Sequence, residues 1–560
     1  MKVIHSILFL LKLCLKTPAG KVGLLILAAI IALELIGIQI SLKFINWNKD
    51  FYNALEEYDV NAALKQIGIF LLLTFFSALQ YLIANYARGL LLIRWRKELT
   101  DTALNLWLRH KNYWYLEQDG TIDNPDQRIA EDCRMFIEYF ISSAIEFITR
   151  VVALFTYFAL LWSISEFALH FTLFNLDITI NHYLVWLAPI YVIISTLITH
   201  YLGAPLMRLN IARKHKEADF RFALTNIREK KEAIALQNGE ATEKALLNDR
   251  FQNVVTNWHT LIRRELILGC FTRPYFTTVL RIPLLFALPI YLINKVTLGS
   301  LMQIASAFQS VVTTLSWFIF SYSKLADMAA ASVRLSTFLQ SLQSREPHTK
   351  TIHAQTDNNT LIINDLKLQN RHNQPLLDIP EKIISTAEPL TVIQGISGLG
   401  KSTLFKTLAG LHPHFNGEII LPKGKLLFLP QQAYFPLTGL LGAIAYPLPA
   451  KKTDETKIIS LLEKVGFTRE KVLPLMNQCD FTQFSGGEQQ RLIIARILFN
   501  QPDWVFMDES CNALDKATEK SMLELLKQEL PKTQFVLISH NIPISNHEMW
   551  RIKSSIAKLS

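Results

Sequence analysis

The stretch of sequence that decides the fold of the C-terminal part is LTVIQGISGLGKST, residues 390–403. From Gly395 onwards it fits the pattern G-x-x-x-x-G-K-[ST], and the mainly apolar run LTVIQ at 390–394 before it predicts a buried strand. A helix is predicted directly after the loop, over residues 403–409. A glycine-rich loop between a strand and a helix turns its backbone N–H groups toward an anion. The segment therefore predicts a phosphate-binding loop.

Two side chains of this loop carry chemistry of their own. The ammonium group of Lys401 would neutralise the β- and γ-phosphate oxygens of a nucleotide, and the hydroxyl of Ser402 would ligate Mg²⁺. The residues expected to contact the nucleotide are Gly395, Ser397, Gly398, Leu399, Gly400, Lys401, Ser402 and Thr403.

A second apolar run, residues 504–507, ends in the two carboxylates Asp508 and Glu509. Beside a phosphate-binding loop, the first of two such carboxylates can support a bound Mg²⁺ ion, and the second can polarise a water molecule. We therefore expect Asp508 to belong to the metal site and Glu509 to act on water.

Between these two motifs lies FSGGEQQR, residues 484–491, followed by an amphipathic helix. Gln431, the sequence NALD at 512–515, and His540 after a predicted strand at 534–538 complete an ordered set. The set resembles the motifs of the ABC-transporter ATPases. This resemblance implies an α/β P-loop nucleotide-binding domain that uses ATP and Mg²⁺.

The resemblance also implies a role for each matching residue. Glu509 would be the general base, Gln431 would sense Mg²⁺ and relay to the membrane part, and His540 would contact the γ-phosphate. The signature residues would complete the nucleotide site of the opposite subunit, so a monomer would lack a complete active site. The implied catalytic set is Lys401, Gln431, Glu509 and His540, the metal set is Ser402, Gln431 and Asp508, and the further nucleotide-binding residues are Ser485, Gly486, Gly487 and Asp515.

The sequence departs from the family pattern at the position that stacks the adenine base. Members usually carry an aromatic residue some way before the phosphate-binding loop, whereas the corresponding stretch here is LKLQNRH, residues 366–372. Arg371 and His372 are the candidates to stack in its place. The preference for ATP over GTP stays open at this point.

Half of the 560 residues are hydrophobic and 19% are charged, against about 25% charged in ordinary soluble domains. Long apolar runs account for the difference and exclude a single soluble globule. The net charge of +10 arises from basic residues that flank these runs, so we expect membrane topology, and no nucleic-acid partner, to explain it. Six spans are predicted, at residues 21–45, 62–93, 146–164, 183–206, 274–293 and 298–322.

Lys and Arg are concentrated in the loops between spans two and three and between spans four and five. The positive-inside rule assigns these loops, and with them both termini, to the cytoplasm. A polar stretch without apolar periodicity follows the last span and predicts a linker. We therefore predict a transmembrane permease domain at 1–340, a linker at 341–360 and a cytoplasmic ATP-binding domain at 361–560.

The membrane half narrows the resemblance. Its sequences NWNKDFYNAL at 46–55, DNPDQRIAED at 123–132 and EADFR at 217–221 are similar to one group of ABC transporters. The group comprises the bacterial SbmA/BacA-related transporters with a fused ATPase (YddA-type) and the peroxisomal acyl-CoA half-transporters of subfamily D. It implies an exporter-like ABC fold, an α-helical six-span transmembrane domain followed by the α/β domain, in a bacterial inner (cell) membrane. The second and third stretches would lie on cytoplasmic loops that dock against the ATPase.

Charged residues inside the predicted spans are candidate contacts for a transported solute, because a charge in a bilayer is costly. Glu34 lies near the middle of the first span and Arg281 lies inside the fifth. Whether these two pair, bind a polar solute or carry protons stays open. Glu146 and Arg150 are four residues apart, and we expect them to neutralise one another.

The sequence as a whole predicts an ATP-driven half-transporter that works as a homodimer with two composite ATP sites in the lipid bilayer. Its cargo would be a large amphipathic solute, such as a peptide, a cobalamin-like molecule, or an acyl-CoA or fatty acid, and no obligatory binding protein is evident. Two alternatives stay open. One is a membrane-anchored ATPase that translocates nothing, and the other is proton-coupled uptake in which ATP is only regulatory.

Overall fold

The structure of the chain is a computed structural model, and it divides into two compact units. The first unit comprises Met1–Asn112 and Asp119–Ser344, and the second comprises Tyr113–Gln118 and Arg345–Ser560. The residues that the structure describes are 2–120, 124–166, 168–173, 176–279, 281–292, 296–344, 352–356, 359–370, 372–385, 389–396, 398–476, 481, 483–509, 514–538 and 548–551.

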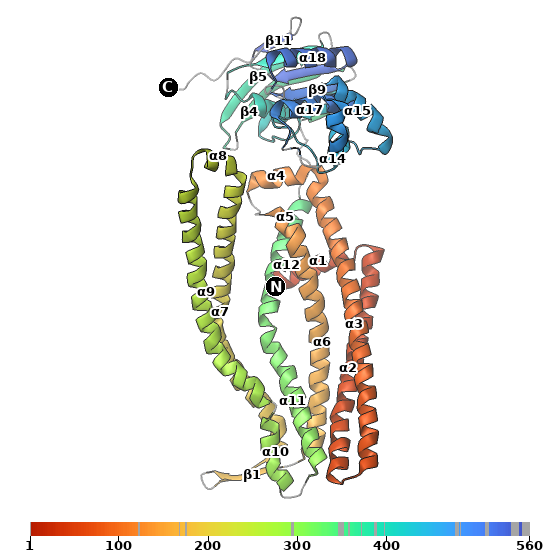
Figure 1. Ribbon diagram of the computed structural model, residues 1–560, viewed down its shortest axis with the longest axis vertical. Helices are drawn as coiled ribbons and strands as arrows, with labels where there is room; N and C mark the ends of the chain where they lie inside the picture. The colour runs from red at the N-terminus through yellow and green to blue at the C-terminus, as the bar shows by residue number, and fades with distance from the viewer. Residues whose placement is uncertain are drawn as a thin grey trace. The chain divides into compact units, whose positions relative to one another are not determined.

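The first unit is built from long helices (Figure 1). Helices α2, α3, α6 and α11 lie side by side, and α7 and α9 form a long pair joined by the short helix α8. The helices are α1 (Lys2–Cys14), α2 (Pro18–Glu56), α3 (Val60–Leu108), α5 (Pro125–Gln127), η2 (Arg128–Asp132), α6 (Cys133–Ile164), α7 (Tyr183–Glu229), α8 (Lys231–Leu236), α9 (Glu240–Val279), α10 (Ile282–Leu292), α11 (Leu298–Phe320) and α12 (Tyr322–Gln343), with a hairpin of β1 (Ala168–Leu173) and β2 (Leu176–Asn181).

Four helical stretches among the described residues are long and apolar enough to cross a membrane: Pro18–Glu56, Val60–Gln118, Pro125–Ile164 and Tyr183–Glu229. They contain the first four predicted spans. The fifth predicted span, 274–293, is divided between the end of α9 and α10, whose 11 residues are too few for a hydrocarbon core of about 30 Å. The sixth coincides with α11.

Close packing of α2 on α3 depends on a glycine. The helix α2 begins where the Thr17 side chain accepts a hydrogen bond from the Gly20 N–H. The indole N–H of Trp95 on α3, a residue only 1% exposed, donates to the Gly20 carbonyl over 3.1 Å. A Cβ atom at Gly23 would lie 2.1 Å from the same indole nitrogen, so no larger residue fits there without movement.

We predict that Gly23→Ala destabilises the first unit, because the new methyl group overlaps the buried Trp95 ring. Overpacking of this kind costs about 1–3 kcal/mol. The matched control is Gly89→Ala on α3, where an added Cβ meets nothing within 4 Å and helix propensity alone favours alanine. Thermal unfolding of the purified protein in detergent checks both variants. Equal melting temperatures for Gly23→Ala and the wild-type protein would contradict the packing argument.

The second unit contains a parallel five-stranded sheet and a mixed four-stranded sheet. The parallel sheet has the order β11-β6-β10-β9-β8, and the mixed sheet has the order β3-β7-β4-β5. The strands are β3 (Ile352–Thr356), β4 (Leu361–Gln369), β5 (Pro375–Ile384), β6 (Leu390–Gln394), β7 (Phe415–Pro422), β8 (Leu426–Leu429), β9 (Trp504–Asp508), β10 (Gln534–Ile538) and β11 (Glu548–Arg551).

The predicted strands at 390–394, 504–507 and 534–538 are confirmed. Their residues are almost all buried, as expected for strands of a parallel sheet that is covered on both faces. The predicted linker is more ordered than expected in its described part. Residues 341–343 continue α12, and 352–356 form β3, which pairs with β7. The exact boundaries of the predicted permease domain, linker and ATP-binding domain remain a prediction.

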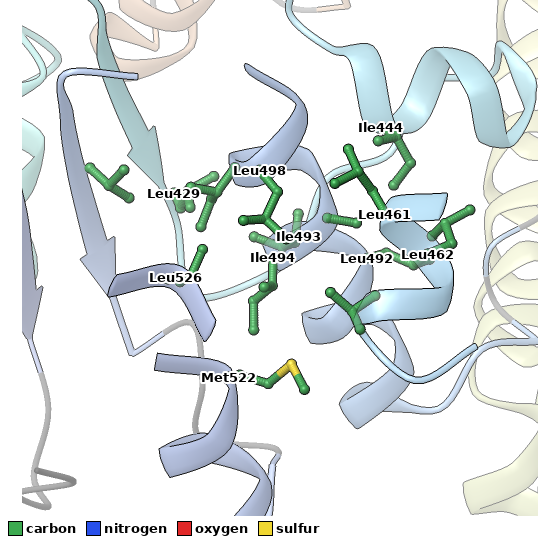
Figure 2. Close-up of a cluster of buried hydrophobic side chains, with 14 of the residues drawn as sticks. Leu429, Ile444, Leu461, Leu462, Leu492, Ile493, Ile494, Leu498, Met522 and Leu526 are labelled. Carbon is green, nitrogen blue, oxygen red and sulfur yellow. The ribbon is translucent and has the colours of Figure 1, made fainter. Parts of the chain in front are cut away.

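A group of helices packs around the amphipathic helix that begins within the FSGGEQQR motif, at Gly486 (Figure 2). Leu492, Ile493, Ile494 and Leu498 on this helix, α17, are buried against its neighbours, α14, α15 and α18. The helices and helical turns of the second unit are α4 (Asn112–Asp119), α13 (Lys401–Leu408), α14 (Gly439–Ala445), η3 (Lys452–Asp454), α15 (Glu455–Lys464), α16 (Arg469–Val472), η4 (Leu473–Leu475), α17 (Gly486–Asn500) and α18 (Lys516–Glu529), with both end residues of α4 in the first unit.

Candidate nucleotide site

The candidate site lies at the carboxyl edge of the parallel sheet. Val392, Leu537, Met507 and Leu429 are register partners on β6, β10, β9 and β8. Because these strands run in one direction, the loops that follow them all emerge at the same edge, which is where open α/β sheets bind ligands. The phosphate-binding loop, Gln431 and the two carboxylates are thereby brought together.

The phosphate-binding loop has the conformation that its glycines allow. Gly398 and Gly400 have φ angles of 84° and 89°, a region that residues with a Cβ rarely adopt, and Gly400 caps the N-terminus of α13. The buried Lys401 ammonium donates to the carbonyls of Gly395 and Ile396 over 2.6 and 3.0 Å. An ammonium has three donors, so a third remains for a ligand such as a phosphate oxygen.

Ser402 and Asp508 come together as the motif predicted. The side chain of Asp508 is 6% exposed, and Ser402 makes a hydrogen bond to it. Burial raises the pKa of the Asp508 carboxyl; the Ser402 hydrogen bond opposes this shift, and the nearby charge of Glu509 adds to it. A cation bound beside these oxygens would favour the ionised carboxylate and so lower its pKa again.

Gln431 and Glu509 also meet. The side-chain amide of Gln431 donates to a carboxylate oxygen of Glu509 over 3.2 Å. Glu509 has a left-handed backbone, with φ of 51°, and its N–H donates to the carbonyl of Ile538 on β10. Strained backbone of this kind is found where a side chain must take one orientation for function.

The signature residues form a helix cap. The Ser485 hydroxyl accepts from the Glu488 N–H, and the Glu488 carboxylate accepts from the Ser485 N–H over 2.9 Å. Hydrogen bonding, first from Lys471 and then from Ser485, lowers the pKa of Glu488. Gly486 and Gly487 form the first turn of α17, so its N-terminal N–H groups are a local anion-binding feature.

Three further predicted residues have different outcomes. Asp515 caps α18 by accepting from the Thr518 N–H over 3.1 Å, and this hydrogen bonding lowers its pKa. Asp515 therefore has a structural task whether or not it also meets a nucleotide. Ser397 and His540 lie outside the described residues, as does Arg371, one of the two residues considered for stacking the base.

The buried Arg496 of α17 was not singled out from the sequence. It is 4% exposed and donates to the carbonyls of Ala443 and Tyr434 over 2.9 and 2.8 Å, while its guanidinium lies against the ring of Phe435. Burial lowers its pKa to about 10, which leaves the group charged at neutral pH. Arg496 thus ties the signature helix to the segment that follows Gln431.

The segment Tyr113–Gln118 was also missed, because its few aromatic residues carry no motif. It belongs to the second unit although it comes from the chain between α3 and α6. The indole N–H of Trp114 donates to the Leu411 carbonyl over 2.8 Å, and the Tyr115 hydroxyl donates to that of Gly410. Tyr113 lines a cavity of about 390 Å³ together with Gln431 and Arg496.

The charges inside the membrane segments have partners that the sequence did not indicate. Glu34 forms an ion pair with Arg88 on α3, whereas Arg281 is exposed in the turn before α10 and lines none of the described cavities. The expected pairing of Glu146 with Arg150 is wrong. Glu146 instead contacts Lys324 over 3.1 Å and accepts from the Trp317 indole N–H over 2.8 Å, so cations and donors of other helices take up both of its oxygens.

The fold and the site define a membrane protein with a fused P-loop ATPase domain. Residues 10–290 match the family "ABC transporter transmembrane region 2", and residues 385–512 match the family "ABC transporter". The chain belongs to the ABC transporters that carry the transmembrane and ATPase domains on one polypeptide.

Similar proteins span nearly the whole chain. The inner membrane ABC transporter ATP-binding protein YddA of Escherichia coli (strain K12) is 31% identical over 98% of this chain and 97% of its own length. The ABC transporter D family member 2, chloroplastic, of Arabidopsis thaliana is 27% identical over 94% and 85%. The lysosomal cobalamin transporter ABCD4 of Homo sapiens is 25% identical over 81% and 79%.

A solved structure confirms the exporter-like fold. The structure of a bacterial Atm1-family ABC exporter with ATP bound aligns with a TM-score of 0.72, covering 94% of this chain and 93% of that one. At 14% sequence identity, this likeness concerns the fold alone.

We predict that Arg496→Met destabilises the second unit, because it removes the charged donor from the carbonyls of Ala443 and Tyr434 and leaves a buried hydrogen bond, the one to Ala443, unmade. Loss of hydrogen bonds to a charged group costs about 1.5–3 kcal/mol. Thermal unfolding of the purified protein, monitored through proteolytic cleavage of the second unit, measures the effect. The control is Arg469→Met, at an exposed position whose side chain makes no hydrogen bond or ion pair to any described residue. Indistinguishable unfolding of the two variants would refute this role of Arg496.

Proposed function

We propose that this chain is one half of an ATP-driven transporter that moves a large amphipathic solute across the bacterial inner membrane by alternating access. The observation that carries the proposal is the pair of contacts at the sheet edge, Ser402 with Asp508 and Gln431 with Glu509. Phosphoryl transfer to water needs oxygen ligands for a metal ion beside the phosphates, and a carboxylate that accepts a proton from the attacking water. Ser402 and Asp508 would supply the ligands, and Glu509, held by the amide of Gln431, would supply the carboxylate.

ATP and Mg²⁺ fit the residues present. The N–H groups of the loop and of α13 would bind the phosphates, and the third donor of Lys401 would neutralise them. No group of three or more His, Cys, Asp or Glu gathers among the described residues to hold a metal ion. This suits Mg²⁺, which binds through one or two protein oxygens together with phosphates and water and stabilises the charge of the transferred phosphoryl group. Ser402, Asp508 and Gln431 would be its protein contacts.

Glu509 would act as the general base, accepting a proton from the attacking water. Gln431 orients its carboxylate by the hydrogen bond of 3.2 Å. In the same proposal His540, in the part of the chain that is not described, would contact the γ-phosphate. Ser485 and Gly487 would complete the site of the opposite subunit from the N-terminus of α17.

A homodimer is supported by the motifs and by the surface of the first unit. Every motif is intact in one chain, so two identical copies supply two composite sites. The long helices α7 and α9 pack mainly on each other, and they leave the large apolar side chains of Phe222, Phe251 and Trp258 76%, 50% and 42% exposed. Such side chains are usually covered by a partner.

The segment Tyr113–Gln118 would transmit the closure of the ATP sites. Trp114 and Tyr115 donate hydrogen bonds to the backbone just after α13, the helix that starts at the phosphate-binding loop. Tyr113 lines one cavity with Gln431. Since the polypeptide continues from this segment into α3 on one side and toward α6 on the other, a movement of the loop would be passed to two membrane helices.

The cargo class is supported by relatives rather than by a motif. One relative is named a lysosomal cobalamin transporter, and the family resemblance extends to carriers of peptides and acyl-CoA. These molecules are large and combine polar with apolar parts. We infer a cargo of the same general kind.

We predict that Glu509→Gln lowers steady-state ATP hydrolysis in lipid vesicles by about a hundredfold or more, because the general base is lost while the shape is kept. The variant should still bind ATP and retain it. Lys401→Ala is the comparison, since it should lose nucleotide binding itself. Hydrolysis and binding of labelled ATP, measured together with solute flux, separate the two effects.

The same experiment tests the alternatives. Hydrolysis without flux of any peptide, cobalamin or acyl-CoA would favour a membrane-anchored ATPase. Solute uptake that persists in Glu509→Gln would favour proton-coupled transport. Normal hydrolysis by Glu509→Gln would remove the assignment of the base.

We predict that Trp114→Ala abolishes the stimulation of hydrolysis by cargo but leaves basal hydrolysis intact. The substitution removes the hydrogen bond to Leu411 and the contact of the Lys406 ammonium with the indole ring. Glu117→Ala, at an exposed position of the same helix, is the control. Cargo-stimulated ATPase assays in vesicles check the prediction, and full stimulation of Trp114→Ala would exclude a transmitting role for this contact.

A further inference from the structure

A polar cavity lies inside the first unit, between three of its membrane-spanning helices. Its volume is about 400 Å³, and its wall is formed by α2, α3 and α6. Four charged side chains line it, although each helix is otherwise apolar in this region. They are Glu34 from α2, Arg88 from α3, and Glu146 and Arg150 from α6.

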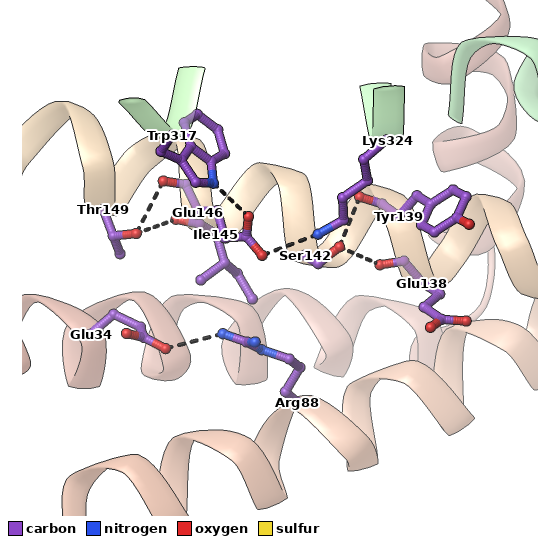
Figure 3. Close-up of polar contacts among 10 residues, drawn as sticks. All are labelled: Glu34, Arg88, Glu138, Tyr139, Ser142, Ile145, Glu146, Thr149, Trp317 and Lys324. Atoms are coloured by element: carbon purple, nitrogen blue, oxygen red, sulfur yellow. Dashed lines mark hydrogen bonds and ion pairs between the residues drawn. The ribbon is translucent and has the colours of Figure 1, made fainter. Parts of the chain in front are cut away.

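Both carboxylates of the cavity have partners (Figure 3). Glu34 accepts from the Arg88 guanidinium over 3.0 Å. The two oxygens of Glu146 are used separately: one accepts from the Lys324 ammonium over 3.1 Å, and the other accepts from the Trp317 indole N–H over 2.8 Å. The negative charges of the wall are therefore balanced without Arg150.

Arg150 has no counter-ion among the described residues. It lies one helical turn from Glu146, yet its side chain makes no ion pair or hydrogen bond to any residue that the structure describes. The charges of the four wall residues sum to zero, but Lys324, which does not line the cavity, also pairs with Glu146. With Lys324 included, the cluster has one positive charge in excess, and Arg150 is its cation without a counter-ion among the described residues. In addition, the Nε of Arg88 is buried and has no hydrogen-bond partner among the described residues.

The excess charge persists at every physiological pH, because a guanidinium is not deprotonated in proteins. An ionised side chain within a membrane span is costly unless it is paired or solvated. The planar guanidinium binds the two oxygens of a carboxylate or a phosphate side by side, which gives both strength and orientation. An anionic group is the partner that would complete the cavity.

The surroundings indicate what carries that group. Gln80, which lines the polar cavity, also lines a second cavity of about 610 Å³ between α2 and α3. The wall of the second cavity is aliphatic and aromatic apart from Gln80 and Lys43. A molecule with an anionic head and a hydrocarbon tail would meet matching chemistry in both cavities.

We propose that the polar cavity binds the single anionic group, a carboxylate or a phosphate monoester, of an apolar-tailed molecule, with Arg150 as the counter-ion. The proposal rests on the transport function proposed above for the identity of this molecule as cargo. It does not depend on ATP hydrolysis, since the charges belong to the first unit alone.

The test is direct binding to the protein in phosphatidylcholine nanodiscs without nucleotide, with protein-free nanodiscs subtracted. The probes are radiolabelled decanoate and decyl phosphate, compared with decanol and decyltrimethylammonium at mildly alkaline pH, where the carboxylate is ionised. We expect saturable binding of the two anions only. Equal saturable binding of decyltrimethylammonium or decanol would overturn the proposal.

Three variants identify the counter-ion. Arg150→Gln should weaken binding of the anions about tenfold or more, the loss expected for one charge-assisted pair. Arg150→Lys should restore most of it, which shows that the charge, and not merely a folded helix, is responsible. Arg134→Gln, which removes an exposed pair with Glu138 on the same helix, should bind as the wild-type protein does. Unchanged affinity of Arg150→Gln would also overturn the proposal.

Two further arms separate the sources of the anion and the two proposals. Addition of phosphatidylglycerol to the nanodiscs would compete with decanoate if a lipid headgroup is the natural occupant, whereas absence of competition identifies a solute. If anions bind through Arg150 but no flux follows, the transport function fails and this inference stands. If flux of a neutral solute is found while anions do not bind, only this inference fails.

Discussion

The parallel alignment of β6, β8, β9 and β10 is the constraint on which the nucleotide site depends. A common direction brings the phosphate-binding loop, Gln431 and the carboxylates Asp508 and Glu509 to one edge, although they come from residues 395–403, 431 and 508–509 of the chain. If any of the four strands ran in the opposite direction, its loop would emerge at the far end of the sheet. With β8 or β9 reversed, for example, Gln431 could not reach Glu509.

The helices around α17 add a second level of organisation. The cap formed by Ser485 and Glu488 sets where α17 begins, and its buried leucines and isoleucines set how it is rotated. Arg496 then connects the helix to the segment after Gln431 by two hydrogen bonds to backbone carbonyls. The signature residues and the Gln431 segment are thereby linked by hydrogen bonds within one unit, which is what a transporter needs if closing its ATP sites is to move its membrane helices.

In the first unit, contacts between distant segments likewise decide the roles of charged residues in apolar surroundings. A carboxylate in a membrane helix must find a cation, and Glu34 and Glu146 find theirs on different helices, α3 and α12. These pairs cross-link the bundle, and they leave Arg150 as an excess charge beside a cavity. The position of a charge in the sequence says that it is costly, whereas its neighbours in space decide whether it is structural or available to a ligand.

The sequence alone determined the features that depend on local order. The phosphate-binding loop, the strand that precedes it, the carboxylates at the end of β9 and the cap at Ser485 all follow from residues within a few positions of one another, because backbone conformation and periodicity are local. The tertiary structure decided the rest. Glu34 pairs with Arg88 rather than standing near Arg281, Glu146 turns from Arg150 to Lys324, and Trp114 reaches Leu411 nearly three hundred residues away. Such pairings depend on the rotation and relative height of packed helices, which no pattern within a single segment encodes.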